Sequence, residues 1–216
     1  MNLAIIPARG GSRGIPGKNL RKLAGRTLVE WAVLAARQSA LVDGVAITTE
    51  SGLIADEAHR LGVPVIYRPE YLSTHEAPLD AVLAHAIEAT SWKDTVVLLQ
   101  PTVPFRQAGL VDECIRSFDA AEADSLFTAQ RLHFVWMQDQ DGRWASNAPH
   151  RPNRQDFPKS SERWAEDGAV FVFKAGLLRK TGCRIGGRVI VHSNPQRTID
   201  IDEPGDLRLA EAILSA

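Results

Sequence analysis

The sequence predicts a doubly wound α/β fold, in which helices cover both faces of a mostly parallel sheet. Short apolar runs alternate along the chain with segments whose apolar residues recur at helical spacing. One run, Val96–Leu99, is wholly apolar, which is typical of a strand buried on both faces of a parallel sheet. Because strand and helix alternate in this rhythm, crossover connections of the doubly wound type are expected.

Local signals bound the predicted elements. Thr27 and Glu30 form the pattern of a capping box at the start of a helix, and Gly62 ends the next helix. Pro204 stands in the first turn of the last helix, and Asp202 is placed to cap it. The other expected strands are the apolar or β-branched runs 3–6, 45–49, 63–67, 126–129, 169–173 and 188–192. The expected helices are 27–39, 51–61, 78–89, 108–118 and a last one that begins near residue 204.

The alternation breaks between about residues 133 and 165. This polar segment is rich in proline and contains Trp136 and Trp144. Two short runs in it flank Asp141-Gly142, a pair that favours a hairpin turn. A plain surface excursion would explain this composition, but tryptophan and arginine are enriched where proteins meet. We therefore favour an inserted arm that packs on another subunit.

The composition limits the class of protein. The 216 residues suit one domain, residues 1–216, and a hydrophobic content of 44% is enough for a core. A net charge of −1 argues against a nucleic-acid surface, which needs a basic excess. No apolar run approaches the roughly 20 residues of a membrane helix, and we expect no signal peptide because the sequence starts with a strand. Cys114 and Cys183 are isolated, so two buried, reduced thiols and a cytoplasmic setting are expected.

The most informative stretch is the loop that follows the first apolar run. It carries four glycines, a serine and three cations, Arg9, Arg13 and Lys18. Glycine lets the backbone approach a ligand, successive loop amides bind anions, and arginine holds phosphate with two parallel hydrogen bonds. The Walker pattern fails, because Ser12 and Asn19 stand where it needs glycine and a hydroxyl residue, and the dinucleotide glycine pattern is missing. We expect a polyphosphate cradle rather than a flexible basic loop.

Asp200 and Asp202 are the second informative feature. Side chains two residues apart in an extended segment point to the same side, so both carboxylates face one site. Mg²⁺ usually takes one or two carboxylates together with substrate phosphates and water. A helix-capping Asp202 and a surface Asp200 would also explain the pair, but the basic loop favours the metal. The metal hypothesis requires the loop and the pair to face each other across a single cleft.

Other polar side chains follow predicted strands, at the edge where a doubly wound sheet binds its ligand. They are Glu50 and Ser51, Arg68, and the stretch 100–106. The six histidines show no metal-ligand spacing, and no Ser-His-Asp order or Cys-His pair suggests a covalent nucleophile. These features favour a site for a phosphorylated ligand and a cation over a covalent active site.

The string Ile-Pro-Ala-Arg-Gly-Gly-Ser-Arg-Gly-Ile-Pro-Gly-Lys-Asn-Leu, at residues 6–20, resembles the nucleotide-binding signature of the acylneuraminate cytidylyltransferases, or CMP-sialic acid synthetases. Further likenesses are Gln-Pro-Thr-Val-Pro-Phe-Arg at 100–106, Arg-Gln-Asp-Phe-Pro at 154–158 and Ile-Asp-Ile-Asp at 199–202. Together the likenesses span residues 4 to 214. The resemblance implies a Rossmann-like nucleotidyltransferase fold, CTP as co-substrate, Mg²⁺ as cofactor and a homodimer formed through the arm.

The resemblance also implies roles for individual residues. CTP would be bound by Ala8, Arg9, Gly10, Ser12, Lys18, Asn19 and Arg68, the acceptor by Gln100, Arg154 and Arg163, and the metal by Asp200 and Asp202. Of these residues, Arg9, Lys18, Asp200 and Asp202 would act in catalysis. Arg163 would stand in for an arginine that, in the family, reaches the substrate of a partner subunit.

Three stretches depart from the family pattern. Thr49-Glu50 stands where the family usually has Ser/Thr-Asp, Glu76-Ala77-Pro78-Leu79 replaces Thr-Ala-Ser-Ser, and Ala165-Glu166-Asp167-Gly168 replaces Arg-Pro-Asn-Gly. The second change removes hydroxyls expected near the nucleotide, and the third removes the arginine. The last two changes affect the identity of the acceptor more than that of the nucleotide.

The expected function is transfer of CMP from CTP to the anomeric hydroxyl of a sialic-acid-like nine-carbon 2-keto acid sugar, with release of pyrophosphate. One alternative is the same transfer to another acidic acceptor: pseudaminic, legionaminic or octulosonic acid, or a phosphonate. Another is a catalytically silent nucleotide-binding module, against which the intact aspartate pair argues. The missing glycine spacing argues against a Rossmann oxidoreductase.

Overall fold

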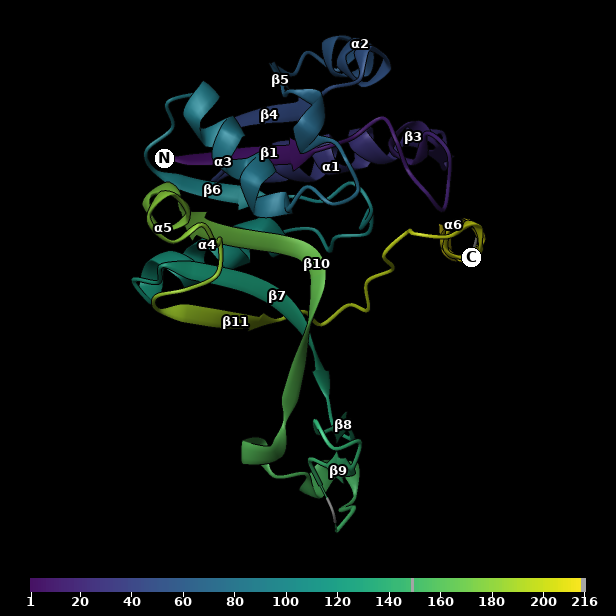
Figure 1. The fold of residues 1–216 in the computed structure, drawn as a ribbon, viewed down its shortest axis with the longest axis vertical. Helices are drawn as coiled ribbons and strands as arrows, with labels where there is room; N and C mark the ends of the chain where they lie inside the picture. Colours follow the sequence, from purple (N-terminus) through teal and green to yellow (C-terminus); the bar gives the residue numbers. More distant parts are fainter. Residues whose placement is uncertain (149, 215–216) are drawn as a thin grey trace.

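Strands and helices alternate along the chain, as the apolar periodicity predicts (Figure 1). The computed structural model describes residues 1–148 and 150–214. The main strands are β1 (Asn2–Pro7), β4 (Gly44–Thr49), β5 (Val65–Tyr67), β6 (Thr95–Leu98), β7 (Ser125–Leu132), β10 (Arg163–Lys174) and β11 (Val189–Ser193). The helices are α1 (Leu28–Gln38), α2 (Gly52–Arg60), α3 (Leu79–Ala89), α4 (Leu110–Ala120), α5 (Ala175–Thr181) and α6 (Pro204–Leu214), with short elements β2 (Lys22–Leu23), β3 (Arg26–Thr27), η1 (Lys18–Leu20) and η2 (Glu70–Leu72). No helix in these ranges is both long and apolar enough to cross a membrane.

Within the described residues, the seven main strands form one mixed sheet in the order β11-β7-β10-β6-β1-β4-β5. Central β1 is parallel to β4 and β6, with Ile5 opposite Ala46 and Leu98. The pairs β4-β5 and β7-β11 are also parallel, whereas β10 is antiparallel to both of its neighbours. This arrangement confirms the predicted mostly parallel sheet. It brings the carboxyl ends of β1, β4, β5 and β6 to one edge.

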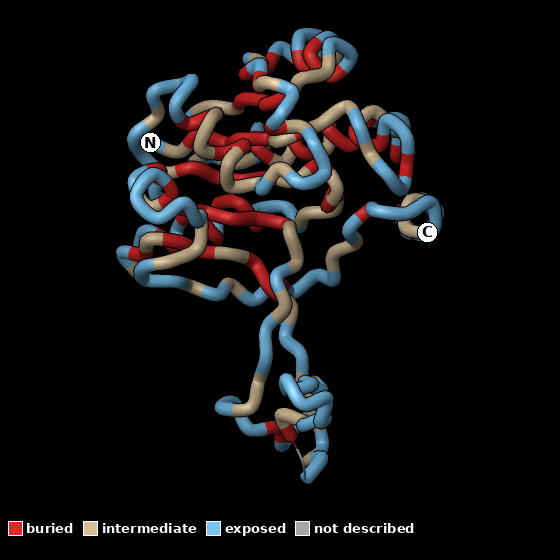
Figure 2. Tube along the Cα trace, viewed as in Figure 1, coloured by how far each residue is buried: buried red, intermediate tan, exposed pale blue. Residues whose placement is uncertain are grey.

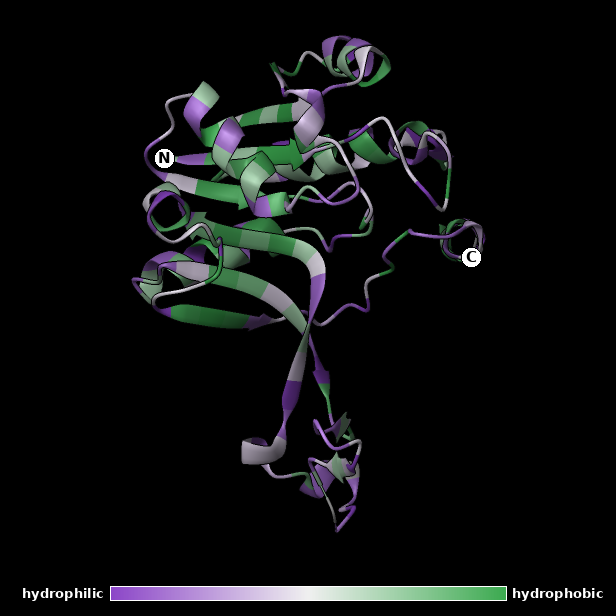
Figure 3. Cartoon of the chain, viewed as in Figure 1, coloured by the Kyte–Doolittle hydropathy of each residue, from purple (hydrophilic) through white to green (hydrophobic). Residues whose placement is uncertain are grey.

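The sheet is apolar on both faces, because successive residues of a strand point to opposite sides. From β1, Ala4 and Ile6 pack in a core with α1, α2 and α4, whereas Leu3 and Ile5 pack in a second core with α3 and α5. Ile5 and Ile6 have no exposed surface, and burial of one such side chain contributes about 1.5–3 kcal/mol. The buried residues and the hydrophobic ones coincide in the sheet (Figures 2 and 3).

Strands β7 and β10 are longer than their apolar runs predict. Their outer halves continue as a two-stranded ribbon, with Arg163 opposite Leu132 and Glu166 opposite Ala129. The register shifts after Glu166, where the ribbon leaves the sheet. An exposed ribbon carries no continuous apolar run, so hydropathy does not reveal it.

The ribbon leads into an arm that extends away from the sheet (Figure 1). The hairpin expected around Asp141-Gly142 is present, because β8 (Trp136–Gln138) pairs with β9 (Trp144–Ser146) and Gly142 has a φ of +81°. Two further turns, η3 (Arg154–Asp156) and η4 (Lys159–Ser161), follow. Phe157 is buried and meets the ring of Phe134 edge-on at 5.3 Å. The rest of the arm is mostly exposed (Figure 2).

The two cysteines lie in different environments. Cys114 is buried in α4, and burial raises the pKa of its thiol to about 12, as suits an unreactive core residue. Cys183 is exposed in the loop after α5, so the prediction of two buried thiols is wrong for this residue. A single cysteine in a short polar loop has no apolar periodicity around it that would indicate its exposure.

We expect one thiol per chain to react within seconds with a water-soluble disulfide reagent in the native protein, and the second only after unfolding. The absorbance of the released reagent thiolate measures both. The variant Cys183→Ser removes the fast reaction. Two fast thiols in the native wild type would contradict the burial of Cys114.

Candidate functional site

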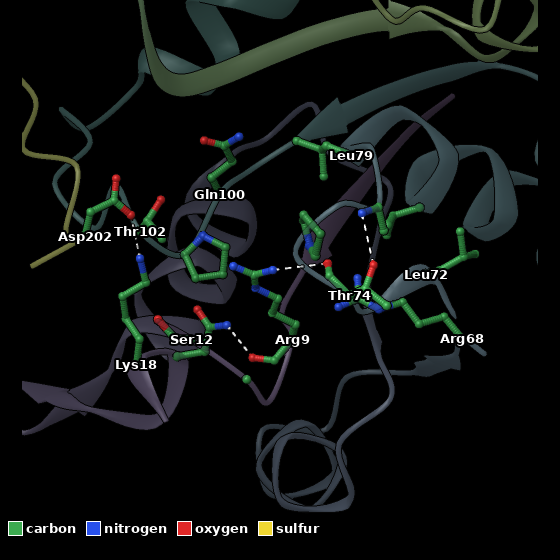
Figure 4. Close-up of a pocket in the computed structure, with 16 residues that line it drawn as sticks. Arg9, Ser12, Lys18, Arg68, Leu72, Thr74, Leu79, Gln100, Thr102 and Asp202 are labelled. Atoms are coloured by element: carbon green, nitrogen blue, oxygen red, sulfur yellow. Dashed lines mark hydrogen bonds and ion pairs between the residues drawn. The ribbon is translucent and has the colours of Figure 1, made fainter. Parts of the chain in front are cut away.

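A cavity of about 290 Å³ opens at the carboxyl edge of the parallel strands. Seven of the residues predicted for the site line it: Arg9, Ser12, Lys18, Asn19, Arg68, Gln100 and Asp202 (Figure 4). They come from the loop after β1, the segments after β5 and β6, and the segment before α6. These stretches meet because parallel strands end at the same edge of the sheet. We call this space the main cavity.

Two loop residues predicted to contact CTP, Ala8 and Gly10, are not among those that line the main cavity. Ala8 is buried, and its amide donates to the carbonyl of Thr48 at 3.0 Å. The Gly10 amide donates to Glu50 Oε1 at 2.7 Å, and a Cβ at Gly10 would lie 2.9 Å from that of Ser51. Gly10 therefore permits the close packing of two loops, and its N–H is already engaged.

The end of the glycine loop points two polar side chains into the main cavity. Lys18 follows Gly17, which has a φ of +63°, and its Nζ donates to Asp202 Oδ1 at 2.7 Å. Asn19 Nδ2 donates to the carbonyl of Arg9 at 2.9 Å, whereas its Oδ1 is buried and has no hydrogen-bond partner within the described chain. An unsatisfied buried acceptor of this kind suits a ligand that donates a hydrogen bond.

A buried ion pair supports the wall formed by Arg68. Its Nη2 donates to Glu50 Oε2 at 3.1 Å, its Nε donates to Ser73 Oγ at 2.9 Å, and its side chain is 3% exposed. Burial alone would raise the pKa of Glu50, but the hydrogen bond from Gly10 and the charge of Arg68 contribute to a net lowering. Glu50, one of the departures from the family pattern, thus connects the glycine loop to Arg68.

We expect Glu50→Gln to destabilise the protein by about 3–5 kcal/mol at neutral pH, because it leaves Arg68 buried without a counter-charge. Folding lowers the pKa of Glu50, so its contribution is complete above the unfolded value near 4.5 and is lost as the pH falls through the folded value. Urea unfolding at pH 7 and pH 4 measures both effects. Exposed Glu88, changed to Gln, is the control; equal stability of both variants at pH 7 would contradict the role of the pair.

The late aspartate segment lies against the glycine loop. Gly14 packs on the backbone of Asp202 so closely that a Cβ at Gly14 would lie 2.1 Å from the carbonyl oxygen of Asp202. Ile201 is fully buried, and its amide donates to the carbonyl of Thr102 at 2.8 Å. The segment is therefore held between the loop after β1 and the loop after β6.

The prediction that Asp202 caps α6 is wrong. Its carboxylate pairs with Lys18, and Asp206 Oδ2 accepts the amides of Asp202 and Glu203 at 3.0 and 2.8 Å. An aspartate before a helix and one in its first turn are both compatible with capping, so the local sequence does not separate them. The ion pair with Lys18 engages the Asp202 carboxylate, and Asp206 takes the amides before α6.

Asp200 lines a second cavity, of about 380 Å³, which shares Gln100 with the main cavity. Desolvation is the main cause that raises the pKa of Asp200; a hydrogen bond from Thr102 opposes it, and the charge of Asp202 adds to it. The two aspartates border different cavities, so the expectation that both face a single cleft is wrong, although the charge of Asp202 still acts on Asp200. A bound cation would relieve that repulsion.

Arg106 is a residue of this region that the sequence analysis did not single out. Its Nε donates to the carbonyl of Ala169 and its Nη2 to that of Gln100, both at 2.7 Å, and burial lowers its pKa to about 10. The guanidinium thus fixes the segment after β6 against β10. Arg106 is the last residue of the string at 100–106 that resembles the family pattern. This likeness could have identified Arg106, but the sequence analysis assigned a role only to Gln100.

A family model described as cytidylyltransferase matches residues 3–170 of the chain. The chain belongs to the cytidylyltransferase family. The match includes the glycine loop, the segment after β6 and the arm, and it confirms the resemblance of the sequence strings.

This member of the cytidylyltransferase family is 30% identical over 216 residues to N-acylneuraminate cytidylyltransferase A of Danio rerio, with 96% of the chain and 49% of the relative covered. It therefore spans about half the length of that relative. It is 28% identical over 228 residues to CMP-N,N'-diacetyllegionaminic acid synthase of Legionella pneumophila. The match covers 98% of the chain and 95% of that relative. A solved CMP:2-keto-3-deoxy-manno-octonic acid synthetase complexed with CTP has the same fold, with a TM-score of 0.75 and 15% sequence identity. The superposition covers 99% of this chain and 98% of the solved one.

The arm of this cytidylyltransferase family member carries both arginines predicted to help bind the acceptor. Arg163 is exposed at the start of β10, and its Nη1 donates to the carbonyl of Glu162 at 2.9 Å. Arg154 belongs to η3, and its side chain lies outside the described part of the structure. The arm extends away from the sheet (Figure 1).

Proposed function

We propose that this protein transfers CMP from CTP to the anomeric hydroxyl of a sialic-acid-like nine-carbon 2-keto acid sugar and releases pyrophosphate. One observation carries the proposal: Lys18 pairs with Asp202 at the wall of the main cavity, which holds the basic glycine loop against the late aspartate segment. The relative named N-acylneuraminate cytidylyltransferase A supports this acceptor, and the legionaminic acid synthase supports the alternative of another acidic sugar. The proposal includes a cytoplasmic setting with reduced thiols.

In this proposal the triphosphate occupies the main cavity and the acceptor occupies the second cavity, with Gln100 bordering both. The acceptor oxygen attacks the α-phosphorus, the bond from that phosphorus to the bridging oxygen of pyrophosphate breaks, and the hydroxyl proton passes to water. Arg9 and Lys18 bind phosphate oxygens and stabilise the charge that develops on the leaving group. Catalysis is then mainly positioning and charge neutralisation.

Asp200 and Asp202 are the residues that would hold Mg²⁺. Their oxygens are the hard ligands that this ion prefers, and a cation would offset the charge of Asp202 that acts on Asp200. In the described residues, no three His, Cys, Asp or Glu side chains cluster around a possible metal position, so phosphate oxygens and water would complete the coordination. When bound, Mg²⁺ neutralises phosphate charge and lowers the pKa of the acceptor hydroxyl.

A panel of acceptors tests the proposed function. The protein is incubated with CTP, Mg²⁺ and, in separate reactions, sialic, pseudaminic, legionaminic or octulosonic acid or a phosphonate, and pyrophosphate is measured. Preferred release with sialic acid supports the main proposal, and preferred release with another acid supports the alternative. CTP binding without pyrophosphate release for every acceptor would overturn both in favour of a silent nucleotide-binding module.

The proposal also includes a homodimer formed through the arm. Trp136, Met137 and Trp144 of the hairpin are 53%, 46% and 62% exposed. Exposed large apolar side chains that gather on one segment mark a contact surface, and aromatic residues are enriched in such surfaces. A dimer would cover this surface and would bring Arg154 and Arg163 toward the cavities of the partner.

We expect Trp144→Asp to weaken dimerisation by about 30-fold or more, because a buried tryptophan anchor contributes about 2 kcal/mol or more to an interface. Sedimentation velocity over a range of concentrations measures this change. Leu53→Asp, at a residue of α2 that is 70% exposed, is the control. A wild-type protein that stays monomeric at every concentration would contradict the dimer.

A further inference from the structure

Arg184 is the cation among the described residues that line the second cavity. The remaining polar lining consists of Gln100, Gln130, Glu166, Asp167, Thr198 and Asp200. The stretch Ala165–Gly168, which departs from the family pattern, contributes to the same wall. A ligand in this cavity therefore finds its positive partner in a residue of the loop after α5.

Two contacts fix the guanidinium of Arg184, and a third holds its loop. Its Nη1 donates to Asp80 Oδ1 at 2.7 Å, and its central carbon lies 4.8 Å from the centroid of the Phe171 ring. The loop behind it is attached to the sheet, because Ser125 Oγ donates to the carbonyl of Gly186 at 2.8 Å. The side chain is 18% exposed. A guanidinium held in this way loses little conformational freedom when it binds a ligand.

Arg184 has hydrogen-bonding capacity that the protein does not use. A guanidinium carries five N–H donors, and Asp80 accepts from Nη1 alone. Its Nε is buried and has no hydrogen-bond partner within the described chain. Because Arg184 lines the second cavity, its remaining Nη donors are available to a ligand that binds there.

The carboxylate of Asp167 is engaged elsewhere. Its Oδ1 accepts from the hydroxyl of Thr128 and from the amide of Ala169, and its Oδ2 accepts from Asn194 Nδ2 at 2.7 Å. Asp80 reaches Arg184 from the start of α3, and Asp80 is not among the residues that line the cavity. The other two carboxylates of the lining, Glu166 and Asp200, do not pair with the guanidinium in the described structure, so no residue of the lining neutralises Arg184.

We propose that Arg184 binds the carboxylate of the acceptor in the second cavity and thereby selects acidic sugars over neutral ones. This inference rests on the proposed function and adds to it the residue that recognises the acid. Guanidinium and carboxylate form charge-assisted hydrogen bonds of matching geometry. Gln100 borders both cavities, so an acceptor held by Arg184 lies beside the nucleotide.

Matched acceptor pairs test the assignment. Each acid of the panel is compared with its carboxamide, and kcat/KM is measured for the wild type, Arg184→Met, Arg184→Lys and the control Arg179→Met. Arg179 is an arginine of α5 whose Nη2 donates to the carbonyl of Trp92, away from the cavity lining. For the wild type and the control we expect the acid to be preferred at least about tenfold.

For Arg184→Met we expect kcat/KM for the acid to fall about tenfold to a hundredfold, mainly because its KM rises. The kcat/KM for the carboxamide and the KM for CTP should change little. Arg184→Lys should keep part of the preference, which still tests the inference if the methionine variant does not fold. Equal losses for acid and carboxamide would show a structural role and overturn the inference. Equal use of both by the wild type would also overturn it, without affecting the proposed function. If the wild type released no pyrophosphate with any acid, both the inference and the proposed function would be overturned.

Discussion

Asp200→Asn is expected to lower kcat/KM by about a hundredfold to a thousandfold while leaving the fold intact. Asparagine keeps the shape of the side chain but removes the charge on which the metal site depends. Losing one such electrostatic contribution to a transition state costs about 10² to 10³ in rate. Desolvation raises the pKa of Asp200, so removal of its charge should not destabilise the protein. Pyrophosphate release and thermal unfolding of the same preparation measure the two effects separately.

Two further variants define what the loss means. Asp202→Asn should reduce turnover as well, and it also leaves the buried ammonium of Lys18 without its partner at 2.7 Å, so we expect it to lower stability too. Asp119→Asn changes an exposed carboxylate of α4 and should leave both properties unchanged. Full activity of Asp200→Asn at limiting Mg²⁺ would refute the metal role.

Gly14→Ala is expected to reduce activity about a hundredfold and to destabilise the protein by about 1–3 kcal/mol. The added Cβ would lie 2.1 Å from the carbonyl oxygen of Asp202, which is far inside van der Waals contact. Because the neighbour is backbone, either the glycine loop or the aspartate segment must move. That movement changes the distance between Lys18 and Asp202, on which the proposed site depends. Steady-state kinetics and urea unfolding provide the two measurements.

Gly176→Ala is the control, since it makes the same change in α5, at a residue that lines neither cavity. A Cβ at Gly176 meets no atom within 4 Å, so activity should stay near that of the wild type and stability should not fall. If Gly14→Ala behaved like Gly176→Ala, close packing of the loop on the aspartate segment would not be part of the site.

Elements with strong local signals could be predicted from the sequence. The apolar run at Val96–Leu99 indicates β6, and Thr27 and Gly62 indicate the ends of two helices; Thr27 Oγ1 accepts the Glu30 amide at 3.0 Å as expected. Helix α5 was missed because its seven residues are too short to display a helical period. The outer halves of β7 and β10 were missed because pairing with each other, rather than burial, makes them strands.

Local sequence is enough to identify the chemical groups that are available: a basic glycine loop after the first strand, two aspartates two residues apart, and a hairpin in the inserted segment. Which of these groups meet depends on contacts between distant parts of the chain. Lys18 and Asp202 are 184 positions apart in the sequence. Because they pair, the Asp202 carboxylate lines the main cavity instead of capping α6. The pairing of Glu50 with Arg68 and the position of Arg184 at the second cavity are likewise set by tertiary contacts. Local sequence patterns involve only a few neighbouring residues, whereas these contacts depend on the spatial order of the strands in the sheet.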